Sequence, residues 1–423
     1  MSRARADGGP GDGLRSSGWA PADARERRGA RGLPGVRPEK PAALQQPTTP
    51  GRTVRPPASN ARYVCGVPID LAVLGQDPRF GGGGAAQTDA FISMARELGR
   101  TPELLHEPHP GLGSPELTWR RVEWLRQLRA ARRLEPAAKE ARSLWVVAPL
   151  AQSGGAAVRT RRSYACWAGT TIRSEWGGRA RGLTPRRRLA AGMSIAGLER
   201  LERRVLRGAT RVYATSPASR ADVAAAAGVS EDDIGILPIP VDLERFAPAP
   251  DEVWLEALSR PVLTFVGRAD DPRKNVPFLL DAFAEIRRVW PEARLRLISP
   301  TPLGAQLPGV EAVRNAVDVA AELRKAAVFM LPSRQEGFGI VAAEAMACGL
   351  PVVTTPSGGP EELVRDSGAG VVTKDLATAI LQLLGARERL TEMRRRGRAY
   401  VDAHHAPDRF REALARALAE VDP

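Results

Sequence analysis

Residues 331–353, LPSRQEGFGIVAAEAMACGLPVV, carry the pattern that decides the fold of this chain. They read as the end of an apolar strand, a glycine-containing loop, a short helix at Ile340–Cys348 and a second strand at Pro351–Thr354. A strand, a helix and another strand in succession favour a parallel sheet with helices packed on its faces. The stretch therefore predicts an α/β fold.

The same alternation continues on both sides of this stretch. In the second half of the chain it predicts strands at Val262–Val266, Leu295–Ile298 and Ala327–Leu331, with helices at Val276–Val289, Leu376–Leu384 and Glu388–Ala403. In the first half it predicts strands at Ile69–Gly75, Leu104–Leu105, Leu144–Ala148, Tyr164–Trp167, Arg211–Thr215 and Ile234–Pro238, with helices at Ala85–Leu98 and Ile195–Leu206. Two such series predict two Rossmann-like domains that face each other across a ligand-binding cleft.

We divide the 423 residues into four segments. Residues 1–60 are rich in Arg, Gly and Pro and show no hydrophobic period, so we expect them to be disordered. Residues 61–245 and 246–405 form the two Rossmann-like domains. Residues 406–423 are expected to form a C-terminal helix that packs back on the first domain.

Two carboxylates stand out in the quoted stretch, Glu336 in the loop and Glu344 eight residues later. On one continuous helix they would be rotated apart by about 80°. Because Gly337 and Gly339 keep Glu336 off the helix, both carboxylates can instead point into one cleft. The loop glycines and the start of the following helix also offer free backbone N–H groups, which suit a diphosphate.

This stretch, which continues into Gly349-Leu350-Pro351, resembles the E-x7-E signature of the glycosyl transferases group 1 family, retaining enzymes of GT-B fold. The resemblance implies that Glu336 contacts the transferred sugar ring and that Glu344 holds the ribose hydroxyls of the nucleotide. It places four neighbouring residues in the same donor site, namely Gly337, Phe338, Gly339 and Ile340. The alternative is that Glu336 caps a helix and Glu344 is a solvated helix residue.

A second segment, Val262–Arg268, agrees with this resemblance. Arg268 ends a predicted strand and Lys274 follows in the loop before a helix. A forked donor and a point charge at the mouth of a parallel sheet suit a diphosphate. The family carries a Gly-Arg and a nearby Lys here, which implies that Arg268 and Lys274 bind phosphate and stabilise the leaving nucleotide. Arg273, between them, is expected to be a solvated surface charge.

Two further glycine-rich loops match the family. Gly83 and Gly84 precede the helix Ala85–Leu98, where the family's glycine loop approaches the donor from the opposite domain. A weak dinucleotide-binding fingerprint is the other interpretation of these glycines. In the later loop, Gly358 and Gly359 either line the rim of the donor site or only form a turn.

The segment Arg162–Thr171 departs from the family pattern. Many members carry a His beside the transferred sugar here, whereas this chain has Trp167, Gly169 and Thr170. The change indicates either an unusual acceptor pocket in the first, acceptor-side domain or a strand packed in the core. It leaves the chain without an obvious general base at this place.

The formal net charge of +14 comes mostly from Arg spread along the whole chain, without a nucleic-acid motif. We therefore expect no nucleic-acid partner. Two basic stretches, Trp119–Lys139 and Arg179–Arg204, place Trp and Leu beside Arg and would suit an anionic membrane surface. A solvated basic face is the alternative.

Bulk composition indicates a globular protein, with 43% hydrophobic and 26% charged residues. No apolar run is long enough to span a membrane, and the N-terminal segment lacks the apolar core of a secretory signal. Cys65, Cys166 and Cys348 are too far apart to suggest a disulfide framework or a zinc site. We expect a cytoplasmic protein without metal or cofactor, at most peripheral to the inner membrane.

Taken with the resemblance, these features predict transfer of a hexose-type sugar from a nucleotide-diphosphate sugar, with retention of anomeric configuration. The sequence does not identify the acceptor, and a glycan, a lipid and a small natural product are the candidate classes. Another GT-B enzyme, such as a nucleotide-sugar epimerase or a synthase, and a non-catalytic nucleotide-sugar-binding module are the alternatives.

Overall fold

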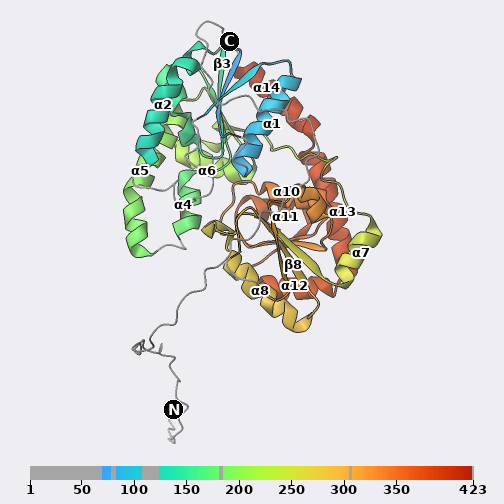
Figure 1. Ribbon diagram of the computed structural model, residues 1–423. Coiled ribbons are helices and arrows are strands. Elements are labelled where there is room, and N and C mark those ends of the chain that lie inside the picture. The colour runs from blue at the N-terminus through green and yellow to red at the C-terminus, as the bar shows by residue number, and fades with distance from the viewer. Residues whose placement is uncertain (1–68, 78–81, 107–122, 181–183, 304–306, 422–423) are drawn as a thin grey trace, which may run out of the picture. The chain divides into compact units, whose positions relative to one another are not determined.

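The computed structural model describes residues 69–77, 82–106, 123–180, 184–303 and 307–421. The predicted disordered segment, together with Cys65 and Trp119, lies outside these residues. The described chain contains two six-stranded sheets, each entirely parallel (Figure 1). We call residues 69–236 the first lobe and residues 251–404 the second lobe. The predicted pair of parallel α/β sheets is thereby confirmed.

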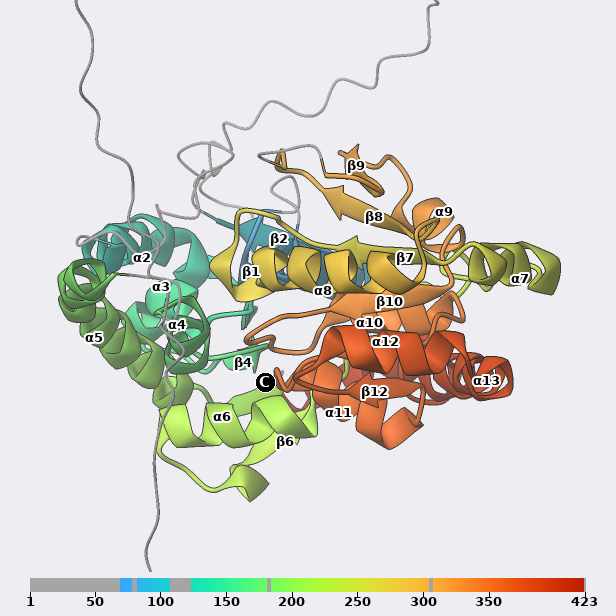
Figure 2. The same cartoon turned by 90° about the horizontal axis from the view of Figure 1, so that it is seen from below.

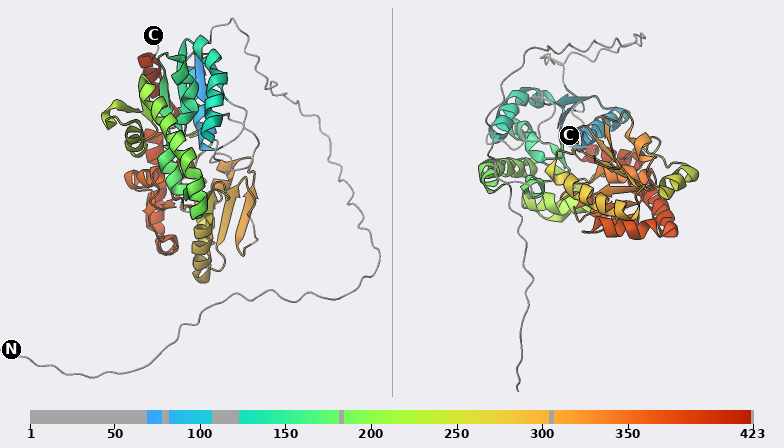
Figure 3. Two further views of the ribbon diagram at one scale, coloured as in Figure 1. Left: turned by 90° about the vertical axis from the view of Figure 1, so that its left-hand side faces the viewer. Right: turned by 60° about the horizontal axis from the view of Figure 1, so that its bottom comes forward.

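The first sheet has the order β2-β1-β3-β4-β5-β6. Its strands are β1 Leu71–Gly75, β2 Pro102–Leu105, β3 Ser143–Ala148, β4 Ala165–Ala168, β5 Arg211–Ala214 and β6 Ile234–Ile236. The helices around it are α1 Gly83–Glu97, α2 Glu123–Glu140, α3 Gly155–Thr160, α4 Ile172–Ala180, α5 Pro185–Gly208 and α6 Pro217–Ala227. Helices α2 and α5 pack side by side (Figure 3). Strands β1, β3 and β4 are almost wholly buried and apolar, as expected for a sheet covered on both faces.

The second sheet has the order β12-β11-β10-β7-β8-β9. Its strands are β7 Val262–Val266, β8 Arg294–Ser299, β9 Val310–Arg314, β10 Val328–Leu331, β11 Val352–Thr354 and β12 Gly370–Val372. The edge strands β9 and β12 were not predicted, because none of their residues is buried and neither strand therefore shows an apolar pattern. The helices are α7 Asp251–Ser259, α8 Val276–Val289, α9 Val319–Leu323, α10 Ile340–Ala347, α11 Gly359–Ser367, α12 Leu376–Leu384 and α13 Arg387–His404.

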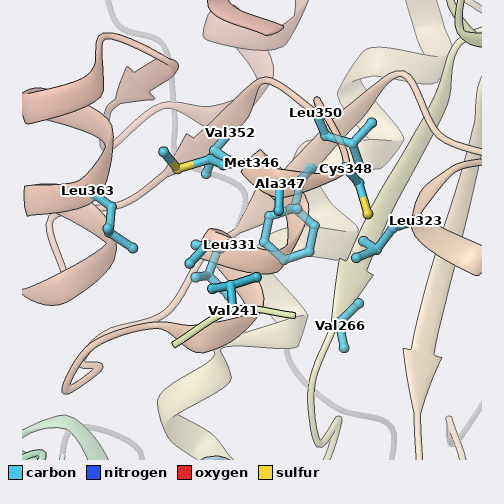
Figure 4. Packing of buried hydrophobic residues seen from close by; sticks show 14 of the residues in the cluster. Val241, Val266, Leu323, Leu331, Met346, Ala347, Cys348, Leu350, Val352 and Leu363 are labelled. Carbon is cyan, nitrogen blue, oxygen red and sulfur yellow. The ribbon is translucent and has the colours of Figure 1, made fainter. Parts of the chain in front are cut away.

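The core of the second lobe is built from the quoted stretch. Figure 4 shows Leu331, Met346, Ala347 and Val352 packed together with residues from other elements of the lobe. Helix α10 is apolar on nearly all sides, which explains why a helix of only eight residues is stable here. On another part of the lobe α8 packs against α12 (Figure 2).

The chain crosses between the lobes twice. The first crossing, residues 237–250, is held where the Val241 N–H donates a hydrogen bond of 2.8 Å to the His405 carbonyl oxygen. The second leads from α13 into α14, Pro407–Val421, which lies against the first lobe. There Phe410 stacks on Trp167 with ring centroids 5.3 Å apart, and the Tyr213 hydroxyl donates to Glu420 at 2.9 Å.

In each sheet the strand order reverses at one place, and ligands of open α/β sheets bind beyond the carboxyl ends of the strands there. In the second sheet the reversal lies between β7 and β10, and in the first between β1 and β3. The loops that leave these four strands carry most of the residues predicted to bind the donor.

Candidate active site

Lys274 and Glu336 meet beyond the carboxyl ends of β7 and β10. Lys274 Nζ lies 2.5 Å from Glu336 Oε1, and the Ser333 hydroxyl donates a hydrogen bond of 2.6 Å to the same oxygen. Both charged side chains are largely buried. Burial raises the pKa of Glu336, but the Lys274 ammonium and the Arg273 guanidinium outweigh it, so the net pKa lies below the usual value. Glu336 is therefore an ionised carboxylate beside a cation.

The position of Lys274 depends on Gly267 at the end of β7. A Cβ on Gly267 would lie 3.3 Å from Lys274 Cε and 3.4 Å from its Cδ, so the lysine stem lies across the glycine. Asp271 caps the short turn Pro272–Lys274 by accepting a hydrogen bond from the Arg273 N–H. The Lys side chain is thus directed from a fixed turn toward Glu336.

Of the two arginines of this segment, Arg273 lies in an environment contrary to prediction. Arg268 pairs with Asp270 at 2.9 Å and its side chain is 40% exposed, and no described contact joins it to Lys274 or Glu336. Arg273, expected to be solvated, is only 18% exposed and pairs with Asp271 at 2.8 Å. The prediction for Arg273 is therefore wrong, because Asp271 of the same turn and Glu175 of α4 both lie beside its guanidinium. Arg268 as a phosphate ligand stays a prediction.

The loop between β10 and α10 needs its glycines for close packing. Gly339 has φ 84°, a conformation that favours glycine, and it begins α10 at Ile340. A Cβ on Gly337 would lie 2.5 Å from the Gly169 carbonyl oxygen of the first lobe. Helix α10 therefore presents its first turn, with its free N–H groups, close to the first lobe.

The later glycine pair supports this loop from its other side. The Glu336 N–H donates a hydrogen bond of 2.8 Å to the Ser357 carbonyl, and Glu336 forms a parallel bridge with Gly358. A Cβ on Gly359 would lie 2.3 Å from the Gly337 carbonyl oxygen. These contacts give Gly358 and Gly359 a packing role. Contact with a ligand stays a prediction.

Phe338 and Glu344 present different groups to the predicted donor site. Phe338 is 4% exposed and its ring packs 5.0 Å from that of His405, so the Phe338 side chain faces the core. Its backbone is the part available to a ligand, and contact between Phe338 and the donor stays a prediction. Glu344 is half-buried, and burial raises the pKa of its carboxyl to about 7 although the Arg245 charge opposes this.

In the first lobe the glycine loop lies at the reversal point of the first sheet. A Cβ on Gly84 would lie 2.2 Å from Gln76 Oε1 and 2.6 Å from Pro149 Cγ, so this helix start requires glycine. Gly83 faces the second lobe, where a Cβ would lie 3.7 Å from Ile340 Cδ1. The first residues of α1 and α10 therefore lie next to each other across the lobes. Two helix N-termini converge on one place.

Trp167 does not line an acceptor pocket. Its side chain is 0% exposed, its indole N–H donates to the Leu237 carbonyl at 2.9 Å, and its ring packs on Phe410. Trp167 is therefore a core residue of the strand, and its buried side chain has no surface available to an acceptor. Gly169 and Thr170 do reach the predicted site, because they lie against Gly337 and Gln335 respectively.

Sequence reasoning missed Ser333 and Gln335. Ser333 hydrogen bonds to Glu336, and the Gln335 amide donates to the Thr170 hydroxyl at 2.9 Å. Both flank Glu336 in the quoted stretch, so proximity to the carboxylate was the available signal. The hydrogen bond of Ser333, however, depends on how the loop turns back toward Glu336, and the partner of Gln335 lies in the other lobe.

In the described part of the chain, no helix combines the length and the apolar character that a membrane span requires. Within the same residues, no group of three or more His, Cys, Asp and Glu side chains could hold a metal ion. Trp119 and the two arginines after it, on which the membrane prediction partly rests, lie outside the described residues.

Residues 260–386 match the model of the glycosyl transferases group 1 family. A relative from Kineococcus radiotolerans, D-inositol 3-phosphate glycosyltransferase, is 37% identical over 198 residues, covering 41% of this chain and 45% of the relative. A relative of the same name from Nocardia farcinica is 32% identical over 254 residues, covering 52% and 55%. The chain thus spans about half the length of the curated relatives it matches.

Solved structures share the fold over a longer span. Sucrose-phosphate synthase from Thermosynechococcus elongatus superposes with a TM-score of 0.66 at 18% identity, covering 83% of this chain and 98% of that one. Anabaena HepE in complex with UDP and glucose superposes with a TM-score of 0.61 at 17% identity, covering 83% and 99%. Residues 260–386 are thus similar to the glycosyl transferases group 1 family, and the two parallel sheets of the described chain form the GT-B fold that its structural neighbours share.

Proposed function

We propose that this protein is a glycosyltransferase that moves a hexose-type sugar from a nucleotide-diphosphate sugar to an acceptor with retention of anomeric configuration. The observation that carries the proposal is the convergence of the α1 and α10 N-termini beside the Lys274–Glu336 pair. Two positive helix ends and an ammonium group form a place for a diphosphate. The match of residues 260–386 to the glycosyl transferases group 1 family supports the reaction class, and retention rests on the family resemblance alone.

Each charged residue has a proposed role. Lys274 and the backbone N–H groups after Gly339 bind the diphosphate, and they stabilise the negative charge that develops as the nucleotide leaves. Arg268 joins them if its guanidinium leaves Asp270 for the phosphates. Glu336 contacts the transferred sugar, and Glu344 accepts hydrogen bonds from the ribose hydroxyls. Glu344 suits this role because its carboxyl, though half-buried, has no described hydrogen-bond partner.

Two comparisons guide the choice of substrates. HepE was crystallised with UDP and with UDP-glucose, so we propose a uridine nucleotide as the first donor to test. The curated relatives are named for D-inositol 3-phosphate, so we propose a small phosphorylated polyol as the first acceptor. Glycans, lipids and small natural products remain further acceptors to test.

The deciding experiment is a panel of UDP-, GDP-, ADP- and dTDP-sugars, read by thermal shift and by release of the nucleoside diphosphate from purified protein. We expect selective stabilisation by one nucleotide and slow release that an acceptor accelerates. Stabilisation without release by any donor, with or without acceptors, would favour the non-catalytic binding module. No stabilisation by any nucleotide would contradict the donor site itself.

Contact with a membrane surface is a separate proposal. A cavity of about 400 Å³ between α2 and α5 is lined by apolar Trp124, Leu125 and Leu128, with Arg200 and Arg204 beside them. Apolar side chains flanked by arginines suit the headgroup region of an anionic leaflet, as at the inner surface of a cytoplasmic membrane. Sedimentation with phosphatidylglycerol vesicles, compared with phosphatidylcholine vesicles, tests this. Equal recovery in both supernatants would contradict it.

A further inference from the structure

A cluster of four charged side chains joins the first lobe to the loop that carries Lys274. From the first lobe, Glu175 and Arg179 of α4 pair with each other at 2.9 Å. From the second lobe, Asp271 and Arg273 pair at 2.8 Å. Arg179 also lies 3.5 Å from Asp271, and Arg273 lies 3.6 Å from Glu175. We call these four residues the α4 clasp.

The α4 clasp is buried and electrically balanced. Each of its side chains is at most 18% exposed, and each lobe contributes one arginine and one carboxylate. Burial raises the pKa of Asp271, but Arg273 and then Arg179 bring the net value down to about 2. Asp271 is therefore ionised, and removal of any one of the four side chains would leave a buried group of the α4 clasp without its partner.

The backbone of α4 comes as close to the donor loop as its side chains do. Gly178 faces Gln335 and Arg273, where a Cβ would lie 2.8 Å from Gln335 Cβ and 3.4 Å from Arg273 Cγ. Gly177, its neighbour in the same helix, has nothing within 4 Å of the corresponding position. The backbone of α4 thus approaches the second lobe closely only on the face that carries Gly178. This packing contact is a separate observation from the ion pairs of the α4 clasp.

The turn touched by α4 is hydrogen bonded to the loop that carries Glu336. The Arg334 N–H donates to the Arg273 carbonyl at 2.7 Å, and the Arg334 guanidinium donates to the Pro272 carbonyl at 3.1 Å. Arg273 immediately precedes Lys274 in the turn that directs the lysine toward Glu336. A displacement of this turn would therefore move the Lys274 ammonium relative to Glu336.

We propose that α4 of the first lobe is a positioning element for the donor site, in which Glu175, Gly178 and Arg179 hold the Asp271–Lys274 turn so that Lys274 faces Glu336. This inference rests on the proposed donor role of Lys274 and Glu336. The three α4 residues do not bind the donor themselves. They act by holding the Asp271–Lys274 turn, so that a helix of the first lobe completes the donor site of the second.

The matched pair Gly178→Ala and Gly177→Ala tests the proposal in the full-length protein. Both changes add one methyl group to the same helix, so both raise its intrinsic helix propensity equally. Only the first pushes against Gln335. We expect G178A to speed amide hydrogen exchange in peptides covering 271–275 and 333–337 and to lower kcat/KM for the donor by about tenfold, since misplacement near 1 Å has large effects. G177A should match the wild type in both measurements.

Arg179→Gln and Asp271→Asn extend the test if G178A fails to fold. D271N keeps the side-chain size, and its amide oxygen still accepts a hydrogen bond from the turn, whereas R179Q removes the charge and shortens the side chain. Because Arg179 and Asp271 interact across the lobes, we expect their effects on kcat/KM to be non-additive in the double variant. Additive effects would contradict a shared action on the turn.

These experiments test the positioning role of α4 separately from the proposed nucleotide-sugar donor site. Equal exchange in G178A and G177A would overturn the positioning role, and so would faster exchange with unchanged kcat/KM. Failure of the wild type to bind UDP, GDP, ADP or dTDP would instead contradict the proposed function. The exchange comparison needs no nucleotide, so it would still decide whether α4 holds the turn.

Discussion

The Thr170 hydroxyl accepts a hydrogen bond of 2.9 Å from the Gln335 amide, so the residue before Glu336 is held by the opposite lobe. Beside it, Gly337 packs so closely on the Gly169 carbonyl that no side chain fits there. The loop that presents Glu336 is therefore shaped by both lobes. Changes in either lobe should alter the chemistry proposed for this loop.

Glu336→Gln should lower turnover by about two orders of magnitude, because it removes the charge that faces Lys274 while keeping the side-chain size. Nucleotide release from the donor measures the effect, with thermal unfolding as a check on the fold. Ser333→Ala serves as the control, since it removes one hydrogen bond to Glu336 and should cost only about fivefold. Turnover of E336Q within twofold of wild type would exclude Glu336 from the reaction.

Lys274→Gln should weaken binding of the nucleoside diphosphate by about tenfold or more, because a charge-assisted hydrogen bond to phosphate is lost. Isothermal titration with UDP measures this directly. Arg287→Gln is a suitable control, since Arg287 is half-buried on α8 and its guanidinium donates to the Pro291 carbonyl. If K274Q and R287Q bind UDP equally well, Lys274 is not a phosphate ligand.

Glu344 should make nucleotide binding depend on pH. Burial raises the pKa of its carboxyl to about 7, and only the ionised form accepts hydrogen bonds from both ribose hydroxyls. Affinity should therefore rise as the pH increases from 6 to 8, over the range centred on this pKa. Glu344→Gln should remove that part of the pH dependence. An identical profile in the wild type and E344Q would show that another group titrates.

Glu202→Gln should stabilise the protein at higher pH. Glu202 is 2% exposed on α5, where its carboxyl accepts from the Ile172 N–H, and burial raises its pKa to about 8. Because this pKa lies above the unfolded value, the stability contribution is full below about pH 4.5 and is lost as the pH rises toward 8. A glutamine at position 202 keeps an oxygen that accepts from the Ile172 N–H, and it does not ionise, so the protein does not lose this stability as the pH rises.

We therefore expect the melting temperature of E202Q to exceed that of the wild type by a margin that grows from pH 5 to pH 8. The gain should approach about 4 kcal/mol at pH 8, since the free energy of unfolding of the wild type falls by about 1.4 kcal/mol per pH unit between the unfolded and the folded pKa of Glu202. Differential scanning calorimetry at several pH values measures it. A constant difference between the two proteins would mean that Glu202 does not titrate in this range.

The fold could be predicted from the sequence because its signals are local. The helices Val276–Val289 and Leu376–Leu384 and the strand Val262–Val266 were placed at their observed bounds, since apolar period and flanking Pro or Gly specify them. The edge strands β9 and β12 were missed. Their residues are half-exposed, and pairing with a neighbouring strand, rather than an apolar pattern, makes them strands.

The candidate site was predicted unevenly for a related reason. Glu336 and Lys274 were singled out from spacing and glycine context, and the structure brings them within 2.5 Å. Arg268 and Arg273 are five residues apart, and the local sequence did not predict that Arg273 is buried. Which arginine is buried depends on Glu175 and Arg179, almost a hundred residues away in the chain.

The sequence by itself determined two parallel α/β series, the glycine loops, and the carboxylates and lysine that mark the proposed donor site. Backbone sterics and hydrophobic period act within a few residues, so one segment is enough to specify them. Tertiary structure alone decided that Trp167 is core, that α14 packs on the first lobe, and that α4 touches the turn before Lys274. Burial and ion pairing arise between segments distant in sequence, and no single segment carries that information.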